Sequence, residues 1–269
     1  MRPDSNLLVS HFGDSTYCWM VENMSNAKEK ARSDSGAISL SEISGAVENY
    51  LSSLFKLAEW GIAPTAVRLA DYLRNLPAAE RLGTSLPSVL GMLRRMSREG
   101  LISVSREKQI YLTPTGLQLA EIAVRRHRLA ECLVVNVIGM DLHVACVEGH
   151  SLEHAISAEM ENHLQKLLEF PTTSPFGAPI PGSGYVPPVG GGITLEEAEP
   201  GTLYYVDRVD EEDPILLRYL VEHGVLPNSR FTVVEAGKYR GVLIFRTDLA
   251  EGSIGYDAVQ RVLLKRCPE

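Results

Sequence analysis

Side chains of the kinds that bind transition metals are concentrated in one stretch of the sequence. The candidates are His127, Glu131, Cys146, His150, Glu153 and His154. On a helix, residues four apart share a face, which places His127 beside Glu131. The same spacing places His150 between Cys146 and His154 on a second helix. Two facing helices could therefore present imidazole, carboxylate and thiolate groups to shared Fe²⁺, Mn²⁺, Co²⁺, Ni²⁺ or Zn²⁺ ions, whereas Mg²⁺ and Ca²⁺ prefer oxygen ligands alone.

Residues 150–154 also fit the H-x-x-E-H pattern of inverted zincins, in which two histidines hold zinc and the glutamate activates water. This pattern makes a zinc peptidase an alternative interpretation. The sequence contains no G-x-S-x-G motif and no Walker-type glycine loop, and the GSG near Gly182 lies in a proline-rich segment instead of following a strand. We therefore expect no catalytic residues, no small organic substrate and no enzymatic activity.

The charge of the chain is distributed unevenly. The formal net charge of -8 would disfavour a nucleic-acid partner if it were spread over the whole molecule. Residues 61–130, however, carry eleven basic and five acidic residues, so this segment has a charge of +6 and the remainder has -14. Clustered arginines and lysines are typical of a face that binds phosphates, although a solvated arginine-rich helix surface remains the alternative.

A winged helix-turn-helix unit is predicted around this basic segment. Apolar residues recur at three- and four-residue spacing over about residues 44–60, which predicts a first helix. Pro64 suits the first turn of a second helix, and residues 84–100 form the third. Two short strands follow at residues 101–105 and 109–113. Three helices followed by a hairpin is the order of a winged helix-turn-helix.

The third helix is the candidate DNA-reading element. Thr84 or Ser85 can cap its N-terminus, and Pro87 is tolerated in its first turn. Serine hydroxyls and a helix N-terminus bind phosphates or base edges, and arginines pair with phosphate or guanine. Mere solvated charge remains the alternative for Arg94 and Arg95. The candidate DNA contacts are Ser85, Pro87, Ser88, Arg94 and Arg95.

Two further helices are expected after the hairpin. One begins at Pro114 or Thr115 and is closed by Gly139, and the other spans about residues 145–170 with one apolar stripe. Because little else could cover this stripe, we expect a homodimer interface there; a monomer that folds the stripe inward is the alternative. The stripe consists of Ile156, Met160, Leu164, Leu167 and Leu168.

The rest of the chain is interpreted as an arm, a linker and a small β domain. Residues 171–192 are dense in proline and glycine and cannot hold a regular element, which is typical of a linker. Residues 193–269 contain short β-rich runs and one short helix near residues 214–223, which favours a small β-barrel. We expect a mainly α chain with a small β part, divided into a flexible N-terminal arm (1–42), a winged helix-turn-helix domain (43–114), a helical metal-binding and dimerisation domain (115–182), a linker (183–192) and a barrel (193–269).

The composition sets the class of protein. With 45% hydrophobic and 22% charged residues the chain is ordinary globular protein, which excludes disorder as its main state. No stretch approaches the ~20 apolar residues of a membrane span, and the N-terminus lacks the apolar core of a secretory signal. The four cysteines are widely spaced without a CxxC pair, which favours reduced thiols. We therefore expect a cytoplasmic protein with no membrane partner.

Six segments carry a family resemblance: ENYLSSLFKLAEWG, LGTSLPSVLGMLRRMSREGLI, TPTG, HRLAE, EGHSLEHAISAEME and SPFGAPIPG. Together they resemble the diphtheria toxin repressor family of iron- and manganese-dependent transcriptional repressors. The resemblance covers residues 43–182 closely, and residues 193–269 are similar to the SH3-like, FeoA-type barrel of many members. It implies a homodimer that binds palindromic operator DNA when loaded with Mn²⁺ or Fe²⁺ and that accepts Zn²⁺, Co²⁺ or Ni²⁺ in vitro.

The resemblance also implies two metal sites. His150, Glu153 and His154 would form the primary, activating site together with Asn49 from the first helix. Relatives usually have Met or Asp at the position of Asn49 and Cys or Glu at that of His150, so this pair matches neither the iron nor the manganese subgroup. The ancillary site would be formed by His127, Glu131, Cys146 and a barrel residue, for which Asp213 is the first choice and Glu212 the second.

An anion site near the ancillary metal site is implied as well. Arg128 and Ser174 match anion-binding positions, although Ala178 replaces the usual asparagine. The break between the second and third helices is longer than usual, centred on LPAAER, and relatives generally lack the N-terminal arm.

The function expected from these features is metal-gated DNA binding. A cation that ties Asn49 to the His150, Glu153 and His154 helix would fix the angle between the DNA-binding unit and the dimer axis. The alternatives are a metal-independent DNA-binding regulator with vestigial ligands and the zinc peptidase.

Overall fold

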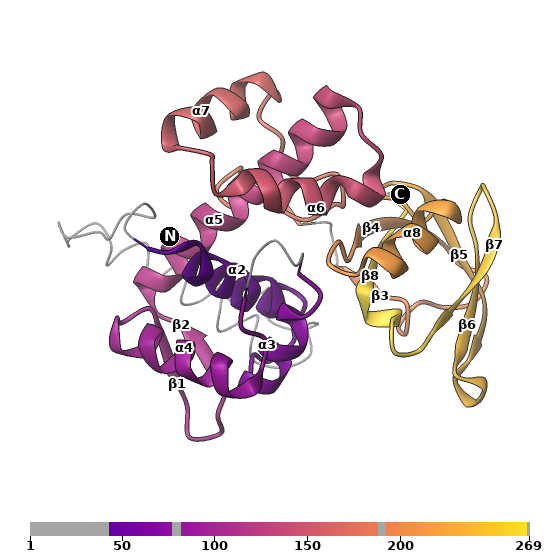
Figure 1. Cartoon of the computed structure of the whole chain (residues 1–269). Coiled ribbons are helices and arrows are strands. Elements are labelled where there is room, and N and C mark those ends of the chain that lie inside the picture. The colour runs from indigo at the N-terminus through magenta and orange to yellow at the C-terminus, as the bar shows by residue number, and fades with distance from the viewer. Residues whose placement is uncertain (1–42, 77–81, 188–191, 268–269) are drawn as a thin grey trace, which may run out of the picture.

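The computed structural model describes residues 43–76, 82–187 and 192–267. An N-terminal helical unit and a C-terminal β-rich unit lie side by side below a central group of helices, and the long helix α5 runs from the first unit into the centre (Figure 1). The expected N-terminal arm and residues 77–81 of the expected insertion lie outside the described residues.

Three helices and an antiparallel hairpin form the N-terminal unit, as predicted. These are α2 (Gly45–Glu59), α3 (Ala66–Leu73), α4 (Leu86–Arg98), β1 (Ile102–Val104) and β2 (Ile110–Leu112). Val47, Leu69 and Met96, one from each helix, are buried in one shared core. The observed order is that of a winged helix-turn-helix, with α4 as its third helix.

Local capping decides where these helices begin. Ser85 caps α4 by accepting a hydrogen bond from the Ser88 N–H at 3.4 Å. Thr65 caps α3 in the same way, by accepting a hydrogen bond from the Arg68 N–H at 3.3 Å. Pro64 therefore lies before the helix, and its expected position in the first turn is wrong because Thr65 occupies the N-cap.

The long helix α5 (Pro114–Cys132) continues as a π-helical segment η3 (Leu133–Ile138). Gly139 ends this segment with a φ of 79°, a conformation that glycine adopts without strain. Both ends agree with the sequence prediction. Because α5 begins at the hairpin and ends in the central group, it connects the N-terminal unit directly to the predicted metal ligands (Figure 1).

The single helix expected over residues 145–170 is wrong, because two helices occupy this stretch. They are α6 (Leu142–Glu153) and α7 (Ala158–Leu167). Ser157 caps α7 by accepting a hydrogen bond from the Met160 N–H at 3.1 Å, and this new start interrupts the helix. The expected apolar stripe is consequently broken, with Ile156 and Leu164 buried while Met160 and Leu167 are exposed.

The proline- and glycine-rich segment after α7 forms no helix, as predicted, but part of it is packed. Phe176 and Ile180 are buried, and the Phe176 carbonyl accepts a hydrogen bond from the Val209 N–H at 3.0 Å. A Cβ added to Gly177 would lie 2.0 Å from the Asp207 carbonyl oxygen. Around Phe176 and Gly177 the chain therefore packs closely against the C-terminal unit, outside the 183–192 range expected for the linker.

The C-terminal unit is a six-stranded antiparallel sheet with the strand order β3-β8-β4-β5-β6-β7 and one helix, as expected for a small barrel. Its elements are β3 (Ile193–Thr194), β4 (Leu203–Val209), α8 (Pro214–Glu222), β5 (Arg230–Gly237), β6 (Val242–Arg246), β7 (Glu251–Gly255) and β8 (Val262–Arg266). The sequence patterns do not predict β3 or β7. Within the described residues, no helix is both long and apolar enough to cross a membrane.

Two helical glycines are expected to respond oppositely to alanine. A Cβ at Gly116 would lie 1.9 Å from the Leu101 carbonyl oxygen, whereas a Cβ at Gly91 would meet nothing within 4 Å. We expect Gly116→Ala to destabilise the protein by about 1–3 kcal/mol through overpacking. Gly91→Ala should stabilise it by about 1 kcal/mol, because alanine is the better helix former. Denaturant unfolding without DNA measures both changes, and equal responses would contradict the close approach at Gly116.

Candidate metal centre

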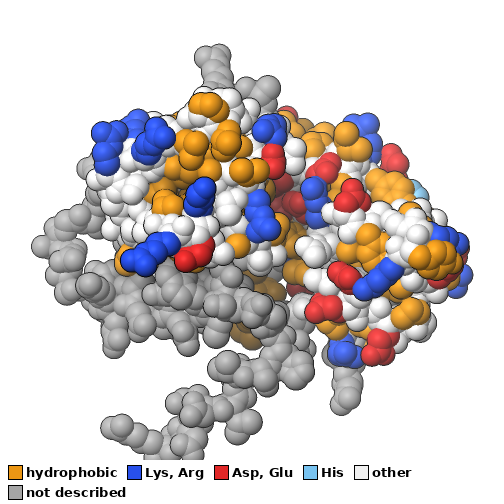
Figure 2. Space-filling model, turned by 90° about the horizontal axis from the view of Figure 1, so that it is seen from below, with side chains coloured by type: hydrophobic (Ala, Val, Ile, Leu, Met, Phe, Trp, Pro, Cys, Tyr) orange, Lys and Arg blue, Asp and Glu red, His pale blue; other side chains and the backbone are white. Residues whose placement is uncertain are grey.

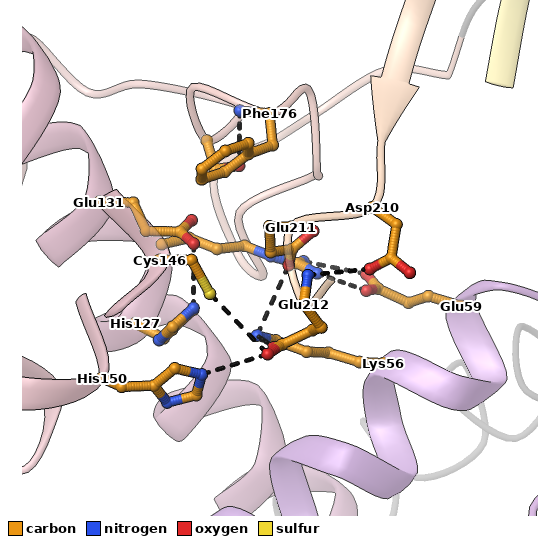
Figure 3. Close-up of polar contacts among 12 residues, drawn as sticks. Lys56, Glu59, His127, Glu131, Cys146, His150, Phe176, Asp210, Glu211 and Glu212 are labelled. Atoms are coloured by element: carbon orange, nitrogen blue, oxygen red, sulfur yellow. Dashed lines mark hydrogen bonds and ion pairs between the residues drawn. The ribbon is translucent and has the colours of Figure 1, made fainter. Parts of the chain in front are cut away.

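Buried ligand-type side chains from three elements converge where the central helices meet the C-terminal unit (Figure 3). Helix α5 provides His127 and Glu131, and α6 provides Cys146 and His150. The loop between β4 and α8 provides Glu212, which is 4% exposed. Ligand atoms of His127, Cys146, His150 and Glu212 all lie within 4.8 Å of one another.

A second set of ligand atoms adjoins the first. One atom each from His127, Glu131 and Glu211 also lie within 4.8 Å of one another. The imidazole rings of His127 and His150 have their centroids 4.3 Å apart. His127 therefore belongs to both sets, so the structure places two candidate ion positions next to each other.

Several buried polar atoms of this cluster lack hydrogen-bond partners among the described residues. They are His127 Nε2 and both carboxylate oxygens of Glu131 and Glu211, although Glu211 Oε1 also forms an ion pair with Lys56 Nζ at 3.5 Å. His127 Nε2 lies 3.0 Å from Glu131 Oε1, but the pair does not have hydrogen-bond geometry. Because buried polar atoms are nearly always satisfied in folded proteins, these atoms indicate a missing partner. A divalent cation would satisfy them, so the donor set fits a transition metal.

The Glu153 carboxylate lies between the imidazoles of His127 and His150 and contacts both. Its carboxylate oxygens lie 2.7 Å from His127 Nδ1 and 3.3 Å from His150 Nδ1. Burial raises the pKa of Glu153, but the two imidazolium charges lower it well below its ordinary range. Glu153 therefore stays ionised and favours the charged form of both histidines.

The histidines themselves hold protons tightly. Burial and the Lys56 charge lower the pKa of His127, but Glu131 and Glu153 raise it well above its ordinary value. Burial likewise lowers the pKa of His150, but Glu212 and Glu153 raise it well above that value. In the absence of metal, imidazolium protons thus supply the positive charge that the surrounding carboxylates need.

The expected primary site is only partly assembled. His154 is the C-cap of α6, and its Nδ1 lies 2.8 Å from Glu48 Oε2 on α2. Asn49, the expected ligand from α2, is 2% exposed. His150, which is expected in this site, lies 3.3 Å from Glu153 and also joins His127 and Cys146. Sequence reasoning missed Glu48, for which the only signal is an acidic residue in the first turn beside Asn49.

Of the two barrel residues considered, Glu212 lies in the cluster and Asp213 does not. Asp213 is the N-cap of α8 and accepts hydrogen bonds from the Ile215 and Leu216 N–H groups. Its other oxygen pairs with Arg261 Nη1 at 2.8 Å. Glu212, the second choice, is therefore the barrel residue that lies among the candidate ligands, whereas capping and the arginine use the Asp213 carboxylate.

The expected anion position already has a carboxylate partner. The Arg128 guanidinium is fully buried and forms a bidentate pair with Glu59, and it also donates to the Pro179 carbonyl. Arg208 on β4 donates to the same Glu59 carboxylate at 3.1 Å. The Ser174 hydroxyl accepts a hydrogen bond from the Phe176 N–H at 3.2 Å. Sequence reasoning missed Glu59, a carboxylate of the N-terminal unit that lies where an external anion was expected.

The candidate DNA contacts lie on the exposed side of α4. Ser85, Pro87 and Ser88 are exposed at its N-terminus, and Arg94 and Arg95 are exposed further along. Arg95 Nε pairs with Glu99 at 2.8 Å. Seen from below, basic side chains surround this part of the N-terminal unit, while acidic side chains are more frequent over the C-terminal unit (Figure 2). The exposed Arg94 and Arg95 thus belong to the outer surface of the basic segment, whereas Arg128 of the same segment is buried.

Two family models match the chain. The model described as iron dependent repressor, metal binding and dimerisation domain matches residues 113–182, and the FeoA domain matches residues 193–266. The chain is 36% identical over 206 residues to the iron-dependent repressor IdeR of Mycobacterium tuberculosis, a match that spans 72% of this chain and 86% of IdeR. It is 40% identical over 135 residues to the diphtheria toxin repressor of Corynebacterium diphtheriae, a match that spans 50% of this chain and 56% of that repressor.

Solved structures are similar over most of the chain. A manganese-dependent transcriptional repressor in complex with manganese superposes with a TM-score of 0.70 and 27% identity, over 82% of this chain and 100% of the other. ScaR with bound Cd²⁺ superposes with a TM-score of 0.68 and 25% identity, over 82% of this chain and 99% of the other.

Metal affinity should increase with pH. The pKa values of His127 and His150 are raised above 6.5, so both imidazoles hold protons near neutral pH that a metal must displace. Affinity should therefore fall about tenfold per displaced proton for each pH unit below the raised pKa values. Calorimetric titration with Zn²⁺ in two buffers of different ionisation enthalpy measures both the affinity and the protons released. A pH-independent affinity with no proton release would contradict the protonated cluster.

Proposed function

The chain belongs to the iron-dependent repressor family, and we propose that it represses transcription as a homodimer that binds palindromic operator DNA when Fe²⁺ or Mn²⁺ is bound. The observation that carries this proposal is the buried cluster of His127, Cys146, His150 and Glu212, which adjoins the helices of the DNA-binding unit. We also propose that it acts in the cytoplasm, where the DNA it binds would be found.

We propose that His127, Cys146, His150 and Glu212 hold one divalent ion, with Glu131 and Glu211 beside it. Glu153 and His154, together with Asn49 on α2, would complete a second position. When bound, a divalent ion supplies concentrated positive charge at the shared ligands. The residues then no longer need imidazolium protons for neutrality, since their carboxylates have a cation partner. The mixture of imidazole, thiolate and carboxylate supports a transition metal.

Contacts of α2 support a link between this cluster and DNA binding. Glu48 in the first turn of α2 reaches His154, and a Cβ at Gly45 would lie 3.6 Å from the same ring. A change in the position of His154 would therefore displace the first turn of α2. Residues of α2 and α4 lie in one hydrophobic core, so the displacement would also affect α4. We propose that ligand rearrangement sets the orientation of α4, and that two copies of α4 enter major grooves about 34 Å apart.

The two alternative functions are less well supported. The chain is similar to the iron-dependent repressor IdeR and to a manganese-dependent transcriptional repressor. These similarities do not favour a metal-independent regulator. Glu153, the general base that a zinc peptidase would require, lies against His127 and His150. Its carboxylate therefore serves to hold imidazoles together.

Operator binding should depend on metal. We expect affinity for a duplex selected from a random pool to fall about 5- to 150-fold when a chelator removes the ion, the range typical of allosteric coupling. Fluorescence anisotropy titrations with Mn²⁺, with Fe²⁺ under anaerobic conditions and with chelator provide the measurement. A scrambled duplex is the control for non-specific binding. Equal affinity with and without the ion would eliminate the proposed function.

Replacing His150 should remove the metal response without unfolding the protein. His150→Ala deletes a ligand shared by the cluster and leaves the hydrophobic cores unchanged, so metal-dependent DNA binding should be lost while the circular dichroism spectrum is retained. His163→Ala removes an exposed histidine of α7 and is the matched control, for which the wild-type response is expected. A full metal response in His150→Ala would show that His150 is not a ligand and that the ion binds at another site.

A further inference from the structure

A lysine is buried at the edge of the metal centre. Lys56 lies in the last turn of α2 and is 2% exposed. Its Nζ lies 2.5 Å from Glu212 Oε1 and 3.5 Å from Glu211 Oε1 (Figure 3). Lysines are rarely buried unless their charge is paired, so this ammonium depends on the two carboxylates of the β4–α8 loop.

The carboxylate of Glu212 is shared between Lys56 and the candidate metal ligands. While Oε1 contacts the ammonium, Oε2 lies 3.3 Å from His150 Nε2 and 3.8 Å from Cys146 Sγ. One buried carboxylate thus serves a fixed cation on one side and the ion position on the other.

The ammonium keeps its charge in this setting. Lysine is protonated at neutral pH, and the Lys56 Nζ lies against both the Glu212 and the Glu211 carboxylates. A permanent positive charge therefore faces the same ligands that would hold a divalent cation. Two cations that share one carboxylate in a buried, weakly screened site repel each other.

We propose that Lys56 is a built-in competitor of the metal for Glu212, and that it sets the concentration of divalent ion at which the protein responds. This inference rests on the proposed function. Without metal, Lys56 ties α2 of the DNA-binding unit to the barrel through Glu211 and Glu212. A divalent ion held by Glu212, His150 and Cys146 would compete with Lys56 for that carboxylate and weaken the tie. The lysine would then lower metal affinity, and the loss of the tie would couple metal binding to α2.

Removing the charge tests the competition directly. Calorimetric titration with Mn²⁺ should show at least about tenfold tighter binding to Lys56→Met than to wild type, because a full charge near an ion site has an effect of this size or more. Lys238→Met, the same change at an exposed lysine that pairs with Glu196, should leave the affinity unchanged. Unchanged or weaker binding to Lys56→Met, with normal binding to wild type, overturns this inference alone. Absence of Mn²⁺ binding to wild type overturns the proposed function as well.

A measurement on the unaltered protein covers the case in which Lys56→Met fails to fold. The buried ammonium of Lys56 should give a ¹⁵N side-chain signal in metal-free wild type that is protected from exchange with water, unlike the signals of exposed lysines. Titration with Zn²⁺, which is diamagnetic, should shift or remove this signal as binding reaches saturation. A signal that stays unchanged while Zn²⁺ binds contradicts a shared Glu212.

Discussion

Charges that are buried where three units meet must be neutralised by partners from other units, and the rest of the structure depends on this constraint. Helix α2 contributes two charges of opposite sign near its C-terminal end, the buried Lys56 and Glu59, whose side chain is 11% exposed. The partners of Glu59 are Arg128 on α5 and Arg208 on β4, whereas those of Lys56 are in the β4–α8 loop. Because neither charge is neutralised within α2, the position of the DNA-binding unit is linked to the charge balance at the junction.

The two ion-pair groups differ in how easily they can be rearranged. Glu59 lies between two guanidinium groups, and Arg208 also stacks on Trp60 with 4.5 Å between its Cζ and the ring centroid. Burial raises the pKa of Glu59, but Arg128 and Arg208 lower it below its ordinary value, so the group stays charged. Breaking such a buried pair typically costs about 3–5 kcal/mol. The ion pairs of Glu59 are therefore costly to rearrange. The carboxylates around Lys56 can instead pair with a divalent ion.

The sequence alone predicts the elements well and the site less completely. The four-residue spacings of His127 with Glu131 and of Cys146 with His150 are local properties of helices, and the structure has them on α5 and α6. The break before Ser157 was missed because a single capping serine competes with an otherwise helical pattern. Glu59 was missed for a different reason: its partners lie about 70 and 150 residues away in the chain, and spacing carries no information about such contacts.

The hydrogen bonds of the β4–α8 loop explain how the barrel places Glu212 in the candidate metal centre. Asp213 caps α8, and the Asp210 carboxylate accepts a hydrogen bond from the Glu212 N–H at 3.1 Å. These hydrogen bonds hold the backbone on both sides of Glu212, whose carboxylate lies in the cluster. Either of two adjacent acidic residues satisfies a sequence pattern for a ligand, but only one can cap the helix. The cap on α8 therefore determines which carboxylate the barrel presents to the metal centre and to Lys56.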